Sequence, residues 1–436
     1  MRGRTGTGAG MLKKLSANLG NFLLSLSDAI DLVSSSIALH QLRTAFVAWQ
    51  IGKAAKLPED RIERIFIAAV LHDIGALSPE DKIRLHNFEE RDLEAHCIRG
   101  ELLFELTPLL RPSARIVRFH HRPWKTWDAN IDAPYVFESQ VLLLSDLLER
   151  LLKRNHYILN QVDELSSGIT SIAGSDIHPD VVDLFLEISK REDFWLDLTS
   201  PRLYSLLLHF GPFRQVEINL EGISSLALFF QRIIDFRSPF TATHSTGVAA
   251  CAALLSRIFG LTETEVVLME MAGNFHDLGK LAVPNSILYK PGKLTKEEFA
   301  VIKQHTYFTY MVLNSIGGLD QITEWAAFHH ERLDGTGYPF HVSADTISTG
   351  SRIMAVADIF TALSEDRPYR KGMERDKIEK ILTSQADRNF QDKRIVNLLL
   401  ENYDEILIKV QRKQAVSRDY YEKQLTSFKN RSSDLN

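Results

Sequence analysis

The chain has 436 residues, of which 44% are hydrophobic and 25% are charged, and its formal net charge is −5 at pH 7. This composition is typical of a globular protein with two or three domains, and the small negative charge gives no reason to expect binding to nucleic acid or to anionic membranes. Two cysteines, Cys97 and Cys251, exclude a disulfide framework and indicate a reducing compartment, so we expect a cytoplasmic protein. No run of roughly 18 apolar residues predicts a membrane span.

Apolar residues recur with a helical period along most of the chain. Residues 141–152 and 395–407 are apolar runs of helical length, while the alternation that is typical of strands is scarce. One predicted helix face consists of His244, Val248, Cys251, Leu255 and Ile258. Another consists of Phe299, Ile302, His305, Thr309, Val312 and Ile316. We therefore predict an all-α fold.

The same pattern of histidines and aspartates occurs twice. In each copy a lone histidine precedes a His-Asp pair by 32 residues (72 − 40 and 276 − 244), and another lone histidine precedes a His-His pair by 24 residues (120 − 96 and 329 − 305). The first set is His40, His72, Asp73, His96, His120, His121 and Asp146. The second set is His244, His276, Asp277, His305, His329, His330 and Asp358. The matched spacing indicates a duplicated metal-binding module, built as tandem helical bundles.

The repeat divides the chain into five predicted segments. Residues 1–21 are expected to be a disordered or helical tail, and residues 22–197 form the first module. Residues 198–221, which contain a Gly-Pro pair, are expected to link the modules. Residues 222–410 form the second module, and the increasingly polar residues 411–436 are expected to be a tail or a frayed helix.

The donors in the second set point to two metal ions. Imidazoles and carboxylates suit Fe, Mn, Zn or Ni, whereas Mg and Ca prefer oxygen donors alone. Seven ligands are too many for one tetrahedral ion, and an aspartate such as Asp277 can bridge two ions roughly 3.5–4 Å apart, as in two-metal hydrolases. Lys280 lies three residues past Asp277, so its ammonium group can face the same pocket and either hold a phosphate oxygen or protonate a leaving alkoxide.

Three motifs of the second module resemble those of the HD-GYP family, bacterial phosphodiesterases of cyclic di-GMP within the HD superfamily of metal-dependent phosphohydrolases. They are HDLGK (276–280), HHERLDGTGYP (329–339) and ADIFTALSEDRPYR (357–370). The resemblance covers about residues 225–410. It implies a helical bundle with two or three metal ions, Fe or Mn before Ni, Co or Zn, that linearises a cyclic dinucleotide.

The resemblance also implies roles for individual residues. One metal ion is expected to be held by His244, His276, Asp277 and Asp358. The other is expected to be held by Asp277, His305, His329 and His330. Lys280 matches the catalytic lysine, acting beside the bridging Asp277. The remaining matches are expected to contact substrate, at the signature loop residues Gly337 and Tyr338 and at Arg367 and Arg370, whose guanidinium groups can bind phosphate or a guanine edge.

The second module departs from the family pattern at two positions. Members with three metals carry a glutamate four residues before the first histidine, but Phe240 stands there and cannot bind a metal. We therefore predict two metals, with the linear dinucleotide pGpG as the main product and slow cleavage onward to GMP, although a third metal stays an open alternative. Thr361 replaces the usual aspartate three residues after the last ligand, so one contact near the centre is left unassigned.

The first module keeps all seven ligands but lacks the other motif residues. Ala76 replaces the lysine, HHRPWKTWDAN (120–130) replaces the GYP motif, and SDLLERLLKRN (145–155) replaces the segment with the two arginines. The favoured interpretation is a degenerate copy kept for packing, dimerisation or regulation. A metal-loaded sensor or a second hydrolase is the alternative.

Several functional alternatives remain open at this point. The enzyme could prefer 3′3′-cyclic GMP-AMP over cyclic di-GMP, because one base edge discriminates the two substrates. A non-catalytic receptor or scaffold is disfavoured by the complete second ligand set and by Lys280, and (p)ppGpp or dNTP hydrolysis is disfavoured by the GYP motif. A homodimer and a regulatory contact between the two modules are further expectations, and no motif identifies an input signal.

Overall fold

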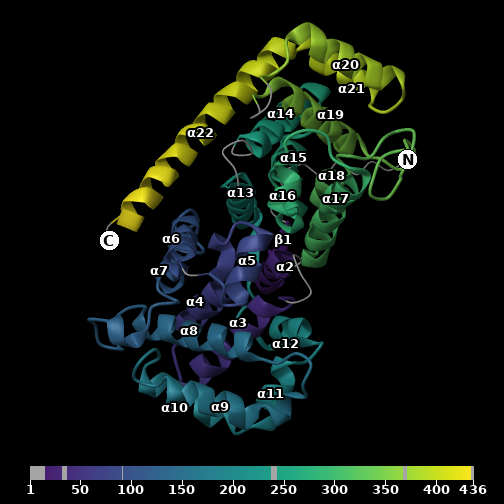
Figure 1. The fold of residues 1–436 in the computed structure, drawn as a ribbon. Helices are drawn as coiled ribbons and strands as arrows, with labels where there is room; N and C mark the ends of the chain where they lie inside the picture. Colours follow the sequence, from purple (N-terminus) through teal and green to yellow (C-terminus); the bar gives the residue numbers. More distant parts are fainter. Residues whose placement is uncertain (1–14, 32–36, 91, 237–242, 367–370, 434–436) are drawn as a thin grey trace. The chain divides into compact units, whose positions relative to one another are not determined.

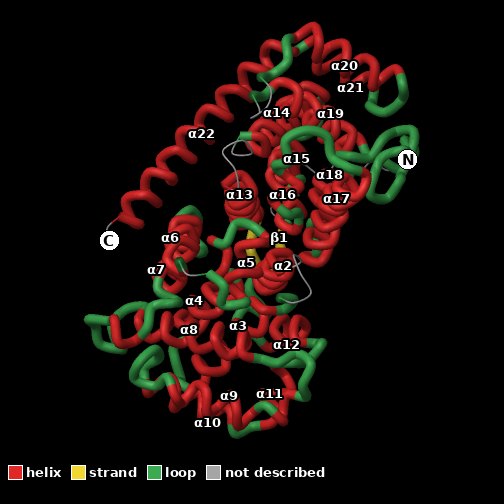
Figure 2. Tube along the Cα trace, viewed as in Figure 1, coloured by secondary structure: helices red, strands yellow, loops and turns green. Residues whose placement is uncertain are grey.

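The structure, a computed structural model, describes residues 15–31, 37–90, 92–236, 243–366 and 371–433 (Figure 1). The regular secondary structure of these residues is helical except for two three-residue strands, β1 (Ser16–Asn18) and β2 (Glu217–Asn219), that pair with each other (Figure 2). The predicted all-α class is therefore confirmed. Within these residues, no helix has the length and apolar character needed to cross a bilayer.

The chain forms two compact units. Asn18–Glu217 make up the first unit together with residues from Phe428 onward, and Ile218–Ser427 make up most of the second. The helices of the first unit are α2 (Leu19–Asp31), α3 (His40–Ala54), α4 (Glu59–Val70), α5 (Pro79–His86), α6 (Leu93–Phe104), α7 (Ala114–Arg118), α8 (Val136–Leu151), α9 (Val162–Ser171), α10 (Pro179–Ser189), α11 (Glu192–Leu198) and α12 (Leu203–Phe210). The helices after β2 are α13 (Leu220–Phe236), α14 (His244–Phe259), α15 (Glu263–Phe275), α16 (Asn285–Leu288), α17 (Lys296–Ile316), α18 (Asp320–Ala327), α19 (Thr349–Ser364), α20 (Arg375–Asp387), α21 (Lys393–Glu401) and α22 (Tyr403–Ser433).

The helix order of the first unit recurs in the second. The helix that begins at the lone histidine, α3 or α14, packs against the helix before the His-Asp pair, α4 or α15, and against the helix with the last aspartate, α8 or α19. A 3₁₀ turn lies at each His-Asp pair: η1 (His72–Gly75) contains the first pair and η5 (Leu278–Ala282) directly follows the second. Each turn packs against the helix of the third histidine, α6 or α17. The duplicated spacing in the sequence therefore reflects a duplicated helical bundle.

Capping residues determine where two of the helices next to the second ligand set begin. Thr262 and Thr295 begin α15 and α17 with capping boxes, in which the threonine side chain accepts from the backbone of the glutamate three residues later. That glutamate, Glu265 or Glu298, accepts in return from the threonine backbone, so two helix-end N–H groups are satisfied. The ends of these helices are thus set by residues close in sequence.

A glycine in each His-Asp motif allows the 3₁₀ turn to touch the neighbouring helix. A Cβ atom on Gly75 would lie 2.0 Å from the backbone oxygen of His96, and one on Gly279 would lie 2.0 Å from the backbone oxygen of His305. Any larger residue would force the turn away from the helix. The close approach brings the His-Asp pair beside the third histidine in both units.

The C-terminal part of the chain differs from expectation. Residues 395–407 form two helices that break at Asn402, whose side chain donates to the backbone oxygen of Leu398 at 2.8 Å. Helix α22 then continues to Ser433, so of the two expectations for this segment, a tail or a frayed helix, residues 411–433 form a helix. The segment 198–221, expected to be a linker, contains helix α12. The polar sequence did not indicate a packed helix because the buried face of α22 includes polar side chains.

Candidate metal centres

The second set of ligands converges from five helices or helix ends. His244 begins α14, His276 and Asp277 follow α15, His305 lies on α17, His329 and His330 follow α18, and Asp358 lies on α19. Contacts of 4.0 Å or less connect all seven side chains into one cluster. All are buried except His330, whose side chain is 30% exposed. The structure therefore brings together every predicted ligand of this set.

Asp277 lies between two groups of histidines. Its Oδ2 atom is 3.2 Å from Nε2 of His276 and 4.0 Å from Nε2 of His244. Its Oδ1 atom is 3.6 Å from Nε2 of His305. Because the two oxygens face different groups, the carboxylate has the position that a bridging ligand requires.

The histidine tautomers fit a cation. The Nδ1 atoms of His276, His305 and His329 donate to backbone oxygens at 2.7, 2.6 and 2.7 Å, respectively. The acceptors are Gly273, Ile302 and Ala326. Each Nε2 atom therefore carries a lone pair, yet the Nε2 atoms of His305 and His329 are only 3.3 Å apart. Two facing lone pairs repel, and Nε2 of His276 is buried without a hydrogen-bond partner, so these residues suit a metal ion between them.

Burial sets the charge of this cluster. Burial lowers the pKa of His305 to about 3 and the pKa of His329 well below its usual value, so both rings are neutral. Burial alone would raise the pKa of Asp277, but His276 and Lys280 hold it well below its usual value. His305 and His329 are thus neutral beside a charged Asp277, which is the protonation state that metal ligands need.

Lys280 and the signature loop lie beside this cluster. The Nζ atom of Lys280 is 2.5 Å from Oδ2 of Asp277. The ring of Tyr338 lies 4.9 Å from the ring of His330, between centroids. A Cβ atom on Gly337 would lie 2.4 Å from Cα of Glu331, so only glycine allows the loop to pack here. The other predicted positions, Phe240, Arg367 and Arg370, lie outside the described residues.

Sequence analysis missed Glu365, which contacts the first ligand of this set. Its Oε1 atom is 2.9 Å from Nδ1 of His244. Burial lowers the pKa of His244, but Glu365 and Asp358 outweigh that effect and raise it to about 10. Thr361 stands where the family usually has an aspartate. Its hydroxyl is buried without a hydrogen-bond partner, so Thr361 does not make the contact that the aspartate would make. Glu365 follows the end of α19, where helical spacing no longer indicates which way a side chain points.

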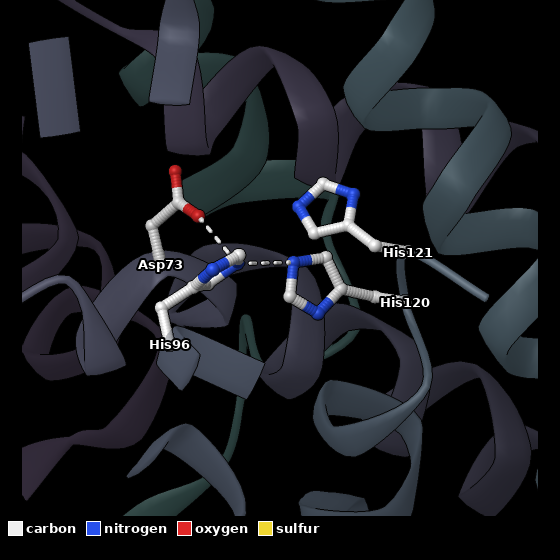
Figure 3. A group of neighbouring side chains, drawn as sticks. All are labelled: Asp73, His96, His120 and His121. Carbon is white, nitrogen blue, oxygen red and sulfur yellow. Dashed lines mark hydrogen bonds and ion pairs between the residues drawn. The ribbon is translucent and has the colours of Figure 1, made fainter. Parts of the chain in front are cut away.

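The first set of ligands forms a cluster of the same kind (Figure 3). The Nε2 atoms of His96 and His120 are 3.3 Å apart, the same distance as in the second set. Asp73 again lies between two groups, with Oδ1 3.8 Å from His96 and Oδ2 3.5 Å from His72. Nδ1 of His120 donates to a backbone oxygen at 2.6 Å. This cluster therefore fits a cation as well.

The first cluster differs in the charged groups around it. Arg150 donates to Oδ2 of Asp146 at 3.1 Å, and a helical turn along α8 allows this contact. Glu149 accepts from Nδ1 of His40 at 2.5 Å and also pairs with Arg43 and Arg154. Sequence analysis missed both Glu149 and Arg150, although their positions three and four residues after Asp146 on a helix would have indicated them.

Comparison with known proteins identifies the two units. Two families, both described as HD domain, match residues 37–165 and 229–395. The chain therefore belongs to the HD-domain family and carries two HD domains. This confirms the resemblance inferred from the motifs, including the second HD-type domain at the N-terminal side.

Relatives of the tandem HD-domain chain include proteins of similar length. One, "3'3'-cGAMP-specific phosphodiesterase 1" of Vibrio cholerae serotype O1, is 29% identical over 395 residues, which cover 88% of this chain and 92% of the relative. Another, "Cyclic di-GMP phosphodiesterase response regulator RpfG" of Xanthomonas campestris pv. campestris, is 39% identical over 184 residues, 41% of this chain and 47% of the relative. A crystal structure of the cyclic GMP-AMP phosphodiesterase V-cGAP3 of V. cholerae aligns with a TM-score of 0.63 at 22% identity, covering 89% of this chain and 98% of that one, which supports the fold.

Proposed function

We propose that the second HD domain is a metal-dependent phosphodiesterase that opens a cyclic dinucleotide and so lowers the level of a second messenger. The observation that carries this proposal is the position of Asp277, whose two oxygens face different histidine groups while Lys280 contacts the same carboxylate. Relatives named as phosphodiesterases of 3'3'-cGAMP or of cyclic di-GMP support the same reaction.

Two divalent ions are proposed as the cofactors, with Fe or Mn favoured and Ni, Co or Zn as alternatives. One ion is assigned to His244, His276, Asp277 and Asp358. The other is assigned to Asp277, His305, His329 and His330. Such ions supply Lewis acidity toward the phosphoryl oxygens and the attacking water.

Lys280 is assigned the proton transfer in this reaction. Hydrolysis adds one water across a phosphodiester bond, and the bond from phosphorus to the 3′ oxygen breaks. The 3′ oxygen leaves as an alkoxide and needs a proton, which the ammonium group of Lys280 can donate. The contact with Asp277 directs this ammonium group toward the ligands. The product is a linear dinucleotide with a 5′ phosphate, pGpG where the substrate is cyclic di-GMP.

An aromatic surface beside the cluster supports a nucleobase as part of the substrate. The ring of Phe299 meets the ring of Tyr338 edge-on at 6.1 Å, and Phe299 is 42% exposed although it is a large apolar residue. Lys303 lies over the Phe299 ring at 5.1 Å. Exposed aromatic rings offer stacking for a purine base, and a neighbouring ammonium group suits a phosphate. Arg367 and Arg370 stay predicted contacts to the same substrate.

The motifs favour cyclic di-GMP, and 3′3′-cyclic GMP-AMP is the second candidate. The relatives that cover most of this chain, 88% and 89%, are named for 3'3'-cGAMP. The relatives named for cyclic di-GMP cover between 30% and 47% of it. The full-length similarity therefore favours the hybrid substrate, and only rate measurements on both substrates decide between them.

The reaction is tested with purified protein loaded with Mn(II) or Fe(II). Cyclic di-GMP, cyclic GMP-AMP and a dNTP are incubated in parallel, and the products are resolved by chromatography. We expect linear dinucleotide from at least one cyclic substrate, no dNTP hydrolysis, and loss of activity in His305→Ala. The matched variant His96→Ala controls for a general effect of removing a buried histidine. Absence of any linear product from metal-loaded protein contradicts the proposal.

We also infer that the first HD domain binds metal without the same chemistry. The 3.3 Å separation of the His96 and His120 Nε2 atoms supports metal binding, and Ala76 in place of the lysine argues against the same proton transfer. Metal analysis of His96→Ala tests this inference, and we expect less metal per chain than in the wild type. Unchanged metal content would show that the first ligand set is vestigial. Two reduced, buried cysteines agree with the cytoplasmic location that we propose.

A further inference from the structure

Helix α22 buries a face that includes polar residues. The buried side chains recur every three or four residues, as Tyr403, Ile406, Val410, Gln414, Ser417 and Tyr421. Apolar packing explains most of these positions, but a buried amide such as that of Gln414 requires hydrogen-bond partners. The partners of Gln414 lead to the second metal centre, even though α22 lies outside residues 229–395, the part matched to the HD family.

Gln414 connects α22 to a metal ligand through Glu365. Its Nε2 atom donates to Oε2 of Glu365 at 3.2 Å and lies 3.3 Å from the backbone oxygen of Thr243. The other oxygen of Glu365, Oε1, lies 2.9 Å from Nδ1 of His244. Both carboxylate oxygens of Glu365 are therefore engaged, one by α22 and one by the ligand. Gln414 also holds the residue directly before His244.

A glycine on α14 leaves space for this arrangement. A Cβ atom on Gly247 would lie 2.6 Å from Nε2 of Gln414 and 2.8 Å from Cγ2 of Thr361. Gln414 therefore reaches Glu365 only because α14 has a glycine at this position. The side chain of Thr361 fills the space next to the amide without hydrogen-bonding to it.

Neighbouring contacts set the register of α22 at Gln414. One turn further along the helix, Ser417 accepts from Arg232 of α13 at 2.7 Å. The guanidinium group of Arg232 also lies over the ring of Tyr420 at 4.4 Å. These contacts prevent α22 from sliding along the bundle, so the amide of Gln414 stays opposite Glu365.

We propose that Gln414 is a positioning residue for the second metal centre. It holds Glu365 in the orientation that fixes the His244 ring, so that Nε2 of His244 points at Asp358 and Asp277. When a histidine binds a metal through one ring nitrogen, a hydrogen bond to its other ring nitrogen orients the ring and raises metal affinity. Loss of such a hydrogen bond lowers metal affinity or activity by roughly 10- to 100-fold. Helix α22 is therefore part of the metal site, and this inference rests on the proposed function only in taking His244 as a ligand.

The test measures metal affinity of the full-length protein by competition with a chelator. The variant Gln414→Met keeps the length and packing of the side chain but removes the amide. We expect the affinity of the second centre to fall by roughly 10-fold or more. We also expect kcat at limiting metal to fall, with recovery in excess metal and an unchanged KM for substrate. The matched control is Gln424→Met on the same helix, which should leave metal affinity unchanged. Measuring both variants in a His96→Ala background removes the contribution of the first HD domain to metal binding.

A double-mutant cycle separates positioning from packing. If Gln414 acts through Glu365, then Gln414→Met should have little further effect on metal affinity in a Glu365→Gln background. Gly247→Ala, which displaces the amide by steric contact, should repeat the affinity loss of Gln414→Met. Unchanged metal affinity in Gln414→Met, or fully additive losses in the cycle, would overturn the proposal. Loss of affinity in a protein that hydrolyses no cyclic dinucleotide would support the positioning role and contradict only the proposed function.

Discussion

At the scale of single residues, Lys280 distinguishes the two HD domains. Its ammonium group contacts Asp277 in the second domain, while Ala76 occupies the matching position of the first. Both domains nevertheless present several histidines around a central aspartate. We therefore expect the difference between a metal site and a hydrolytic site to depend on one basic side chain and on the proposed substrate surface beside it.

Replacing Lys280 tests this distinction. Because the lysine is assigned to protonate the leaving oxygen, Lys280→Ala should lower kcat by roughly 10²-fold or more. Metal content should not change, since the ligands are intact. Steady-state kinetics and elemental analysis check both expectations, with Lys290→Ala as the control for removing a half-exposed lysine. A normal kcat in Lys280→Ala would assign the proton transfer to another group.

Phe299 tests the proposed stacking surface. Base stacking on an aromatic ring contributes about 1–3 kcal/mol, so Phe299→Ala should raise KM by about 5-fold or more while kcat and metal content stay near their wild-type values. Met311→Ala is the matched control, because Met311 is also a large exposed apolar residue of α17, at 45% exposure against 42% for Phe299. Equal KM values for the two variants would exclude a role for Phe299 in substrate binding.

At the scale of secondary-structure elements, each centre depends on a contact between a 3₁₀ turn and a helix. The turn η5 approaches α17 so closely that only Gly279 fits against the backbone of His305. The matching turn η1 depends in the same way on Gly75 and α6. The ligands on the two elements keep their separation only while this contact is intact.

Gly279→Ala is therefore expected to disrupt the second centre. A methyl group 2.0 Å from a backbone oxygen forces the elements apart, and such overpacking typically costs about 1–3 kcal/mol of stability. Urea unfolding and metal analysis should show lower stability and loss of metal from this domain. Gly75→Ala should destabilise the first domain by a similar amount. Wild-type metal affinity in Gly279→Ala would mean that the ligands tolerate displacement of the turn.

At the scale of the whole molecule, metal binding and folding are linked. Ions that bind the folded chain but not the unfolded chain stabilise it, by about 2.7 kcal/mol per site at a concentration 100 times Kd. A chelator should therefore lower Tm in a thermal unfolding experiment, and added Mn(II) should restore it. His305→Ala and His96→Ala should each remove part of this effect if both HD domains bind metal. A chelator-independent Tm would contradict metal binding in both domains.

Communication between the HD domains stays a prediction, as does a homodimer. If the first domain regulates the second, then His96→Ala should change the kinetics of cyclic-dinucleotide hydrolysis even though all second-domain ligands are intact. Unaltered kinetics would exclude this regulatory role. Sedimentation of the metal-loaded protein tests the homodimer separately.

The residues that form the two candidate metal centres could be predicted from the sequence by itself. The histidines and aspartates of both clusters lie at helix starts, at helix ends and on buried helix faces. The number of residues between them is therefore set by the lengths of the helices and turns that separate them. For this reason the 32- and 24-residue spacings sufficed to find both sets, and the all-α class followed from helical periodicity. The motif around Lys280 then predicted that the two copies differ in chemistry.

Only the tertiary structure decided which groups support the ligands. Glu365 follows the end of α19, and Gln414 is 170 residues past His244 (414 − 244) on a segment whose polar sequence predicted a tail or a frayed helix. No local pattern connects such residues, because a hydrogen bond between separate helices depends on how the helices pack and not on their spacing in the chain. The same holds for Gly279 and Gly247, whose missing side chains matter only because another segment occupies the space.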